Sequence, residues 1–227
     1  PKAAAVIAGK VPELMVSFVG DSDFFTSAMA EAVLQKAEAY DVLAIGPGLG
    51  RDAETGRFVK EILTHWRKPI IVDADALYAV KEMEIDLARC PGQLILTPHV
   101  GEFAHLTGRT AAEAERERIN GAIAFAMDRE VTLVLKGMPT VIAAADGFAY
   151  VNVTGNPGMA TGGMGDTLTG IIAALVGQEM DPEPAAICGV YLHGLSGALL
   201  ARETPVGYTA SDVARMVPMA RKMVTGD

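Results

Sequence analysis

The residues best suited to chemistry lie in a glycine-rich segment at residues 156–166, Asn-Pro-Gly-Met-Ala-Thr-Gly-Gly-Met-Gly-Asp. An apolar stretch typical of a helix follows at once, so Gly162, Gly163 and Gly165 stand at a predicted helix N-terminus. Glycines allow backbone N–H groups to turn towards one point, and the helix dipole adds positive potential there. The three glycines therefore predict an anion hole for a phosphate group.

Asp166 ends this segment, and its carboxylate would repel a bound phosphate. A carboxylate at this place is therefore expected only if a cation shields its charge or if the carboxylate takes part in the chemistry. One such task is to accept the proton of an attacking hydroxyl group, and we interpret Asp166 as a general base. A purely structural interpretation stays open, because aspartate is common at helix N-termini and glycine-rich turns precede many helices in α/β proteins. The segment fits neither the Walker A loop nor the Gly-x-Gly-x-x-Gly dinucleotide motif.

Short apolar runs alternate with longer amphipathic stretches along the chain, which is typical of βα units. The predicted strands lack strict alternation, as expected for a parallel sheet covered on both faces, and span residues 14–19, 42–45, 69–72, 94–96 and 131–135. Predicted helices span residues 26–39, 55–66, 76–83, 111–127, 166–176, 184–202 and 211–222. Residues 140–144 and 148–151 flank an Asp-Gly turn and predict a hairpin. The expected fold is α/β, with a mostly parallel central sheet between two layers of helices.

Glycine-rich or polar segments follow four of these strands, where ligands gather in open parallel sheets. They are residues 46–50 (Gly-Pro-Gly-Leu-Gly), 73–75 (Asp-Ala-Asp), 97–102 (Thr-Pro-His-Val-Gly-Glu) and 136–140 (Lys-Gly-Met-Pro-Thr). His99 offers a hydrogen-bonding group, and Glu102 a direct or water-mediated Mg²⁺ ligand. Lys136 offers a positive charge or a backbone contact to a phosphate or ribose.

Each of these segments also has a structural interpretation. Residues 46–50 fit a tight turn between strand and helix, and Asp73 or Asp75 fits a cap of the next helix. His99 fits a surface loop, whereas His65, His105 and His193 lie in helix-like stretches where a structural role is expected. No single segment decides between the two interpretations.

Composition limits the classes of partner. The chain has 227 residues, of which 50% are hydrophobic, and a net charge of −9 without a basic block, which argues against nucleic acid or an anionic membrane as partner. Cys90 and Cys188 lie far apart, which favours neither a zinc site nor a disulfide framework and fits a cytoplasmic location. We expect one domain over residues 1–227 and no membrane span.

Five motifs in order make the chain resemble the ADP/ATP-dependent NAD(P)H-hydrate dehydratase family, whose fold is ribokinase-like with three layers. They are the segments at residues 46–50, 72–77, 96–102, 135–140 and 156–166. The Gly-Gly-x-Gly-Asp element is shared with vitamin and sugar kinases of the same fold, whereas the His99 loop and the lead-in at residues 156–161 distinguish the dehydratases.

The resemblance implies a lyase that repairs nicotinamide cofactors hydrated at C6, the S epimer of hydrated NADH or NADPH, at the expense of ADP or ATP and with Mg²⁺. It implies a phosphorylated intermediate, with Asp166 as base for the C6 hydroxyl group. It also implies that the dinucleotide contacts Gly50, His99 and Asp166. The residues implied for the nucleotide are Lys136, Gly137, Met138, Pro139, Thr140 and Gly165, and Glu102 is carried over from the related kinases as a metal-side carboxylate.

Family members usually begin with a further strand and helix, which would precede Pro1, so this strand-helix segment is expected to be missing from the chain. The epimerase domain that accompanies many bacterial dehydratases is likewise expected to be absent from this chain, so interconversion of the hydrate epimers is expected to need another domain or protein. Homo-oligomers are usual in the family.

Two alternatives stay open at this stage. One is a small-molecule kinase of the same fold that phosphorylates a hydroxymethyl group of a vitamin precursor, again with Asp166 as base. The other is a module that binds a nucleotide without turnover. A stable phosphorylated product would favour the kinase, and indifference to loss of Asp166 would favour the module.

Overall fold

The computed structural model of the chain describes residues 6, 9, 11 and 13–226. Its centre is a six-stranded sheet in the order β1-β2-β3-β4-β5-β6, in which β1 to β4 are parallel and β5 and β6 are antiparallel to their neighbours. The strands are β1 (Leu43–Ile45), β2 (Ile70–Val72), β3 (Leu94–Leu96), β4 (Thr132–Leu135), β5 (Thr140–Ala143) and β6 (Ala149–Asn152). The mostly parallel sheet and the hairpin are as the sequence predicts.

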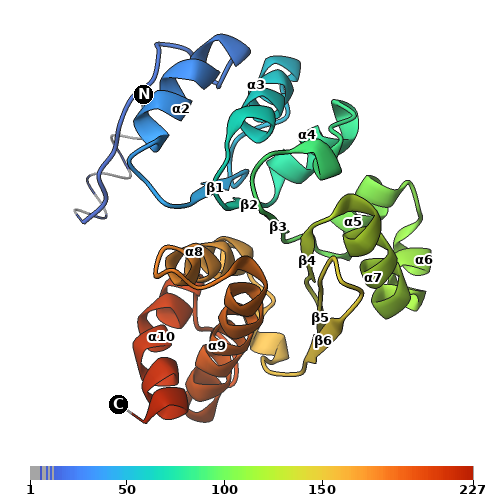
Figure 1. Cartoon of the computed structure of the whole chain (residues 1–227). Coiled ribbons are helices and arrows are strands. Elements are labelled where there is room, and N and C mark those ends of the chain that lie inside the picture. The colour runs from blue at the N-terminus through green and yellow to red at the C-terminus, as the bar shows by residue number, and fades with distance from the viewer. Residues whose placement is uncertain (1–5, 7–8, 10, 12, 227) are drawn as a thin grey trace.

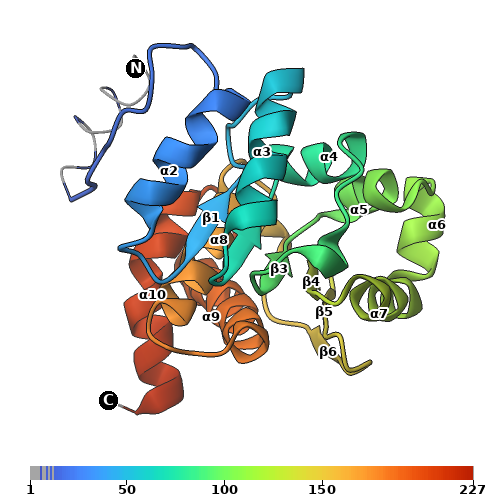
Figure 2. The same ribbon diagram turned by 45° about the horizontal axis from the view of Figure 1, so that its top comes forward.

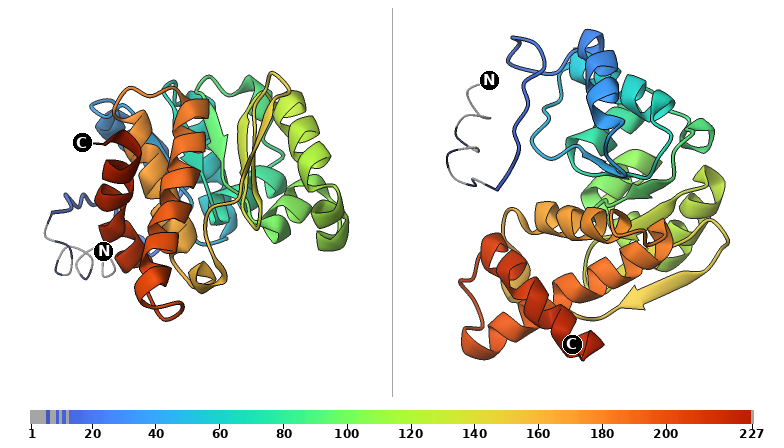
Figure 3. Two further views of the ribbon diagram at one scale, coloured as in Figure 1. Left: turned by 90° about the horizontal axis from the view of Figure 1, so that it is seen from below. Right: turned by 60° about the vertical axis from the view of Figure 1, so that its left-hand side comes forward.

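Helices cover both faces of this sheet (Figure 1). The longer helices are α2 (Ala30–Ala37), α3 (Ala53–His65), α4 (Asp75–Glu82), α5 (Val100–Thr107), α6 (Ala111–Arg116), α7 (Arg118–Arg129), α8 (Met164–Val176), α9 (Pro182–Glu203) and α10 (Ala210–Thr225). Short 3₁₀ turns occur at Ser27–Met29, Leu87–Arg89 and Pro157–Met159. In the right-hand view of Figure 3, α8, α9 and α10 (orange to red) form one group below, and the blue-to-green helices α2, α3 and α4 lie above.

The strands alternate between two apolar cores, because successive side chains of a strand point to opposite faces. In β2, Ile70 and Val72 pack into the core beneath α3 and α4, whereas Ile71 packs into the core beneath α8 and α9. All three side chains are buried, which explains why the sequence shows an unbroken apolar run. The sheet is therefore the middle of three layers, and the carboxyl ends of its parallel strands share one edge.

Two sequence expectations are wrong. Residues 14–19 do not form a strand; they pair with no other strand in the described part of the chain, and Leu14, Met15 and Phe18 are more than half exposed. The helix expected at residues 111–127 is two helices that meet at Glu117. Arg118, directly after this break, is buried and donates hydrogen bonds to carbonyl groups of residues 135–139.

The structure also contains a helix that is not among those predicted, although His105 lies in a helix-like stretch of the sequence. α5 begins directly after His99, in a segment expected to be a loop. The His99 ring accepts from the N–H groups of Gly101 and Glu102 while the Glu102 carboxylate accepts from the His99 N–H, so this pair forms a capping box. A histidine as cap and a glycine in the first turn hide this helix from propensity arguments.

α9 is long and apolar enough to cross a membrane by length and composition alone. In the structure α9 packs on α8 and α10 and reaches β3 to β6 of the sheet. In Figure 2 α9 lies beside α8 and α10. A Cβ added at Gly189, Gly194 or Gly197 would lie less than 3 Å from Ile172, Thr154 or Met159, so neighbouring residues approach the helix closely at these glycines. The apolar character of α9 is thus explained by burial within the protein.

Candidate active site

The glycine cradle (Gly162, Gly163 and Gly165) lies at the start of α8, as the sequence predicts. Gly163 is the N-cap and has a positive φ of 86°, a conformation that glycine adopts without strain. A Cβ on Gly165 would lie 3.2 Å from Nζ of Lys136, so the backbone approaches that cation closely, whereas Gly162 faces open space. The cradle is therefore an open helix N-terminus with a lysine ammonium group beneath it.

Asp166 lies in the first turn of α8 and its side chain is exposed. It lines a cavity of ≈ 760 Å³, the Asp166 cavity, together with Thr169 and Gly170 of α8 and Gly46 and Pro47 of the loop after β1. The remaining wall is largely apolar and comes from β1, α2 and residues 15–25. The cavity has the size of a small-molecule site, and its carboxylate is accessible to a ligand.

A buried polar network lies directly behind the cradle. Asp73, at the end of β2, is 1% exposed, and its two carboxylate oxygens accept hydrogen bonds from Lys136 Nζ (2.8 Å) and Thr169 Oγ1 (2.9 Å). The Lys136 ammonium group also lies 3.8 Å from Oε2 of Glu102. Because a buried carboxylate needs a charged or hydrogen-bonding partner, Asp73 and Lys136 fix each other beneath Gly165.

His99 and Glu102 lie beside this network, as the strand-end argument predicts. The backbone N–H of Lys136 donates to the Pro98 carbonyl group (2.8 Å), which places the two strand ends side by side. Nδ1 of His99 accepts from the N–H groups of Gly101 (3.0 Å) and Glu102 (3.2 Å), so the neutral ring carries its proton on Nε2. Nε2 lies 3.5 Å from the Glu102 carboxylate, and that carboxylate also accepts the His99 N–H (2.8 Å).

The loop at residues 136–140 is held from below by Arg118, which sequence analysis does not single out. Nη1 of Arg118 donates to the carbonyl groups of Leu135 (3.4 Å), Lys136 (3.2 Å) and Pro139 (3.2 Å). A Cβ on Gly137 would lie 2.5 Å from the guanidinium nitrogens, so only glycine fits there. Met138, by contrast, is 65% exposed at the tip of the loop.

Gly50 lies at the neighbouring loop after β1. Its N–H donates to Oδ2 of Asp75 (3.0 Å), and Nε of Arg51 donates to Oδ1 of the same carboxylate (2.8 Å). Neither Asp73 nor Asp75 caps α4 with its side chain, so the helix-cap interpretation of these aspartates is wrong. Gly46 and Pro47 line the Asp166 cavity, whereas Gly50 lines an adjoining hollow with Arg51 and Asp75.

The pKa of one group behind the cradle departs strongly from its ordinary value. His193 of α9 hydrogen-bonds the backbone of Met164, the first residue of α8. Burial lowers the pKa of His193 from 6.5 to about 4, the hydrogen bond opposes this shift, and the Lys136 charge adds to it. His193 is therefore neutral at physiological pH, and Lys136 is the cation of this region.

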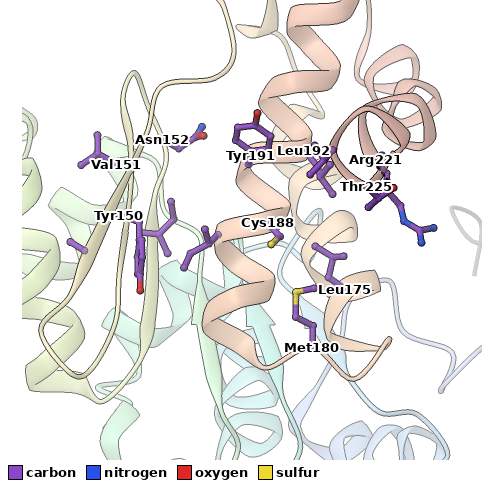
Figure 4. A pocket seen from close by; sticks show the side chains of 14 residues that line it. Tyr150, Val151, Asn152, Leu175, Met180, Cys188, Tyr191, Leu192, Arg221 and Thr225 are labelled. Atoms are coloured by element: carbon purple, nitrogen blue, oxygen red, sulfur yellow. Dashed lines mark hydrogen bonds between the residues drawn. The ribbon is translucent and has the colours of Figure 1, made fainter. Parts of the chain in front are cut away.

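A second large cavity has no part in this arrangement. It measures ≈ 680 Å³ and lies between the β5-β6 hairpin, α9 and α10 (Figure 4). Tyr150, Cys188 and Tyr191 are among its mostly apolar lining residues. Leu175, which also lines it, is roughly 14 Å along α8 from Asp166 at the usual helical rise. None of the residues predicted for the reaction lines this cavity.

Within the described residues, no group of three or more His, Cys, Asp or Glu side chains could by itself hold a metal ion. Glu102 lies 3.8 Å from the Lys136 ammonium group and also faces His99. These residues fit a cation that arrives with phosphate ligands and meets at most one protein carboxylate, the pattern usual for Mg²⁺.

A mostly parallel sheet with an accessible carboxylate and an open helix N-terminus at its carboxyl edge is the arrangement of a ribokinase-like α/β protein. A solved ribokinase-like superfamily protein from Enterococcus faecalis superposes with a TM-score of 0.80 at 30% identity, over 97% of this chain and 74% of that one. The chain belongs to the NAD(P)H-hydrate dehydratase family, whose family model matches residues 1–219.

Two relatives show how close the similarity is. The bifunctional NAD(P)H-hydrate repair enzyme of Moorella thermoacetica is 50% identical over 173 residues, which cover 76% of this chain but 33% of that protein. This chain thus spans about a third of that relative's length. The ADP/ATP-dependent NAD(P)H-hydrate dehydratase of Bacillus subtilis, crystallised with ATP and Mg²⁺, has a TM-score of 0.81 at 32% identity, over 98% of this chain and 76% of that one.

Proposed function

We propose that this chain dehydrates the S epimer of hydrated NADH or NADPH to the intact cofactor at the expense of ADP or ATP. The observation that carries the proposal is the exposed Asp166 carboxylate beside the glycine cradle, in a cavity large enough for a substrate. Membership of the NAD(P)H-hydrate dehydratase family supports the choice of substrate.

Asp166 acts as general base in this proposal. It takes the proton of the C6 hydroxyl group, whose oxygen then attacks the terminal phosphorus of the nucleotide, so that AMP leaves from ADP or ADP leaves from ATP. The phosphate group then leaves C6 with the C–O bonding electrons, and loss of a proton from C5 restores the ring double bond. Phosphorylation is useful because hydroxide is a poor leaving group and phosphate is a good one.

The glycine cradle stabilises the phosphoryl group during transfer. The N–H groups at the start of α8 donate to its oxygens, and the Lys136 ammonium group beneath Gly165 adds positive potential. Asp73 keeps that ammonium group in place through its 2.8 Å ion pair. Lys136 thus adds to the positive potential at the phosphoryl group from the side of the Gly165 backbone that faces the protein interior.

The loop formed by Lys136, Gly137, Met138, Pro139 and Thr140 contacts the nucleotide together with Gly165 in this proposal. Arg118 supports the choice of this loop, because it fixes two of the loop's carbonyl groups, and that of Leu135 just before it, before any ligand arrives. When bound, Mg²⁺ would neutralise charge on the transferring phosphates. Glu102 would hold the cation through water, since both its oxygens already have protein partners.

Gly50 and His99 contact the hydrated dinucleotide in this proposal. Both residues are fixed by neighbours before substrate binds, Gly50 by Asp75 and His99 by the first turn of α5. Nε2 of His99 lies 3.5 Å from the Glu102 carboxylate, and the side chain is 60% exposed, so a ligand can reach the ring at the protein surface.

A product analysis tests the proposal. The protein is mixed with hydrated NADH, Mg²⁺ and ADP, and NADH, AMP and inorganic phosphate are measured over time. The proposal predicts all three in a ratio of one to one to one. A phosphorylated dinucleotide that accumulates without NADH would instead identify a kinase, and binding without any product would identify a nucleotide-binding module.

The biological setting follows from the same proposal. The bifunctional relative supports cooperation with an NAD(P)H-hydrate epimerase, supplied by another domain or protein, that delivers the S epimer. The reaction repairs a soluble cofactor pool, which favours the cytoplasm, where the expected absence of disulfides also fits. A homo-oligomer stays a prediction from the family resemblance.

A further inference from the structure

A small hollow of ≈ 260 Å³ lies next to His99, on the side of α5 that faces α4. The polar side chains of its wall are those of Arg51, Tyr78, His99, Glu102 and His105, and we call it the Arg51 hollow. Nothing described so far gives Arg51, Tyr78 or His105 a role. The hollow is smaller than a site for a whole cofactor, which needs some 300 Å³ or more, so it suits one part of a ligand.

The guanidinium group of Arg51 is held in a fixed orientation although its side chain is 59% exposed. Nε donates to Asp75, and the guanidinium carbon lies 4.7 Å from the centre of the Tyr78 ring. The other face of that ring stacks on His105, with centroids 4.6 Å apart and planes at 4°. The terminal N–H groups of Arg51 are thereby presented to a ligand with little loss of side-chain entropy.

Two carboxylates at the hollow already have partners. Asp75 accepts from Arg51 and from Gly50, and Glu102 faces His99 and Lys136. Glu82 lies 3.3 Å from Nε2 of His105, which has no hydrogen-bond partner. The unused groups are therefore donors, above all the terminal N–H groups of Arg51. A planar fork of N–H donors matches two oxygens of a phosphate group.

Asp75 connects the hollow to the reaction site. The same carboxylate holds the N–H of Gly50, a proposed substrate contact, and the guanidinium group of the next residue. His99, the other proposed contact, belongs to the wall of the hollow itself. A dinucleotide that reaches Gly50 and His99 would bring one of its phosphate groups within reach of Arg51.

We propose that the Arg51 hollow is a subsite for a phosphate-bearing ribose unit of the hydrated dinucleotide, with Arg51 as the residue that binds the phosphate. This inference rests on the proposed dehydratase function. Two sources of the phosphate share this chemistry: the pyrophosphate bridge, present in both hydrated cofactors, and the ribose monophosphate, present only in hydrated NADPH.

The test compares Arg51→Gln with the matched control Arg57→Gln, since Arg57 is 52% exposed and paired with Glu54 as Arg51 is with Asp75. KM and kcat are measured for hydrated NADH and hydrated NADPH at saturating ADP and Mg²⁺. In Arg51→Gln we expect KM to rise about 10- to 100-fold, as for loss of a charge-assisted hydrogen bond, with kcat and the KM for ADP unchanged. Arg57→Gln should behave like wild type.

A rise of KM for both substrates would assign the hollow to the pyrophosphate, and a rise for hydrated NADPH alone would assign it to the ribose phosphate. Arg51→Lys, which keeps the charge but not the fork, should fall between Gln and wild type. KM values within twofold of wild type for both substrates would overturn the proposal.

An equilibrium binding measurement distinguishes failure of the subsite proposal from failure of the dehydratase proposal. NADPH and NADH are titrated into the wild type and both variants by calorimetry, without nucleotide. If turnover fails but Arg51→Gln still weakens dinucleotide binding relative to Arg57→Gln, the subsite stands and the dehydratase proposal fails. Equal binding by Arg51→Gln and wild type, or no binding by wild type, would refute the subsite.

Discussion

Arg118→Met is the substitution whose effect follows most directly from the structure. Methionine keeps the apolar stem but removes the guanidinium group that donates to Leu135, Lys136 and Pro139. The Arg118 side chain is 10% exposed, so its loss leaves carbonyl groups without their donor, each at a cost of about 1–3 kcal/mol when buried.

The magnitude is smaller than the sum of three such costs. The three bonds share one nitrogen at 3.2–3.4 Å, and water can reach the exposed side of the loop at Met138. Glu115, which forms an ion pair with Arg118, is 53% exposed, so loss of this ion pair costs little stability. We therefore expect a loss of about 2–4 kcal/mol in the free energy of unfolding, which lowers Tm by roughly 5–15 °C in a protein of this size.

The assay is thermal and urea denaturation of Arg118→Met beside Arg109→Met. Arg109 pairs with Glu117 but is 39% exposed, and its loss should cost less than about 1 kcal/mol. ADP binding by calorimetry should weaken in Arg118→Met only, because the nucleotide loop loses its support. If the two variants lose equal stability, the argument that Arg118 organises the loop is refuted.

Three further predictions concern other residues. Gly46→Ala should destabilise the protein by several kcal/mol in urea denaturation, because the new Cβ would lie 1.7 Å from a backbone carbonyl oxygen. The control Gly48→Ala has open space around it and should cost only about 1 kcal/mol, because of its positive φ. Equal losses of stability in the two variants would contradict this prediction. For His193, the unfolded chain binds a proton near pH 6.5 and the folded chain only near a pKa of about 4, so the free energy of unfolding should fall by about 3 kcal/mol as pH drops through that window. Urea titrations from pH 7.5 to 4.5 should show a flatter dependence in His193→Gln, and an unchanged slope would exclude this origin. Iodoacetamide should modify the exposed Cys188 before Cys90, whose thiol pKa is raised by burial and then by Asp86; mass spectrometry of the peptides would reveal the opposite order if this is wrong.

The sheet and the cradle could be predicted because their signals are local. Four apolar runs end in glycine-rich or polar segments, and each is a parallel strand with those segments at one edge. Residues 14–19 have the same apolar character but no strand partner in the described part of the chain, and partnership cannot be read from composition. The cradle could be predicted from three glycines next to a helix-like stretch, without knowledge of contacts elsewhere in the chain.

The residues behind the cradle could not be found from the sequence. Asp73 and Asp75 are two residues apart and equally suited to a cap, yet one is buried against Lys136 and the other holds Gly50 and Arg51. Arg118 reaches its carbonyl partners only because the helix breaks at Glu117, a break that no proline or glycine announces. Each of these roles depends on contacts between segments far apart in the chain.

The central claim is that Asp166 is the base of a nucleotide-dependent dehydration. The most direct measurement follows absorbance of the reduced nicotinamide with hydrated NADH, Mg²⁺ and ADP or ATP, for wild type, Asp166→Asn and Asp181→Asn. Asp181 is an exposed aspartate at the N-cap of α9 without a side-chain cap bond, so it controls for charge at a helix start. We predict nucleotide-dependent recovery of NADH in wild type and Asp181→Asn, and a rate about 10²- to 10⁴-fold lower in Asp166→Asn. Equal rates in Asp166→Asn and wild type would contradict the account.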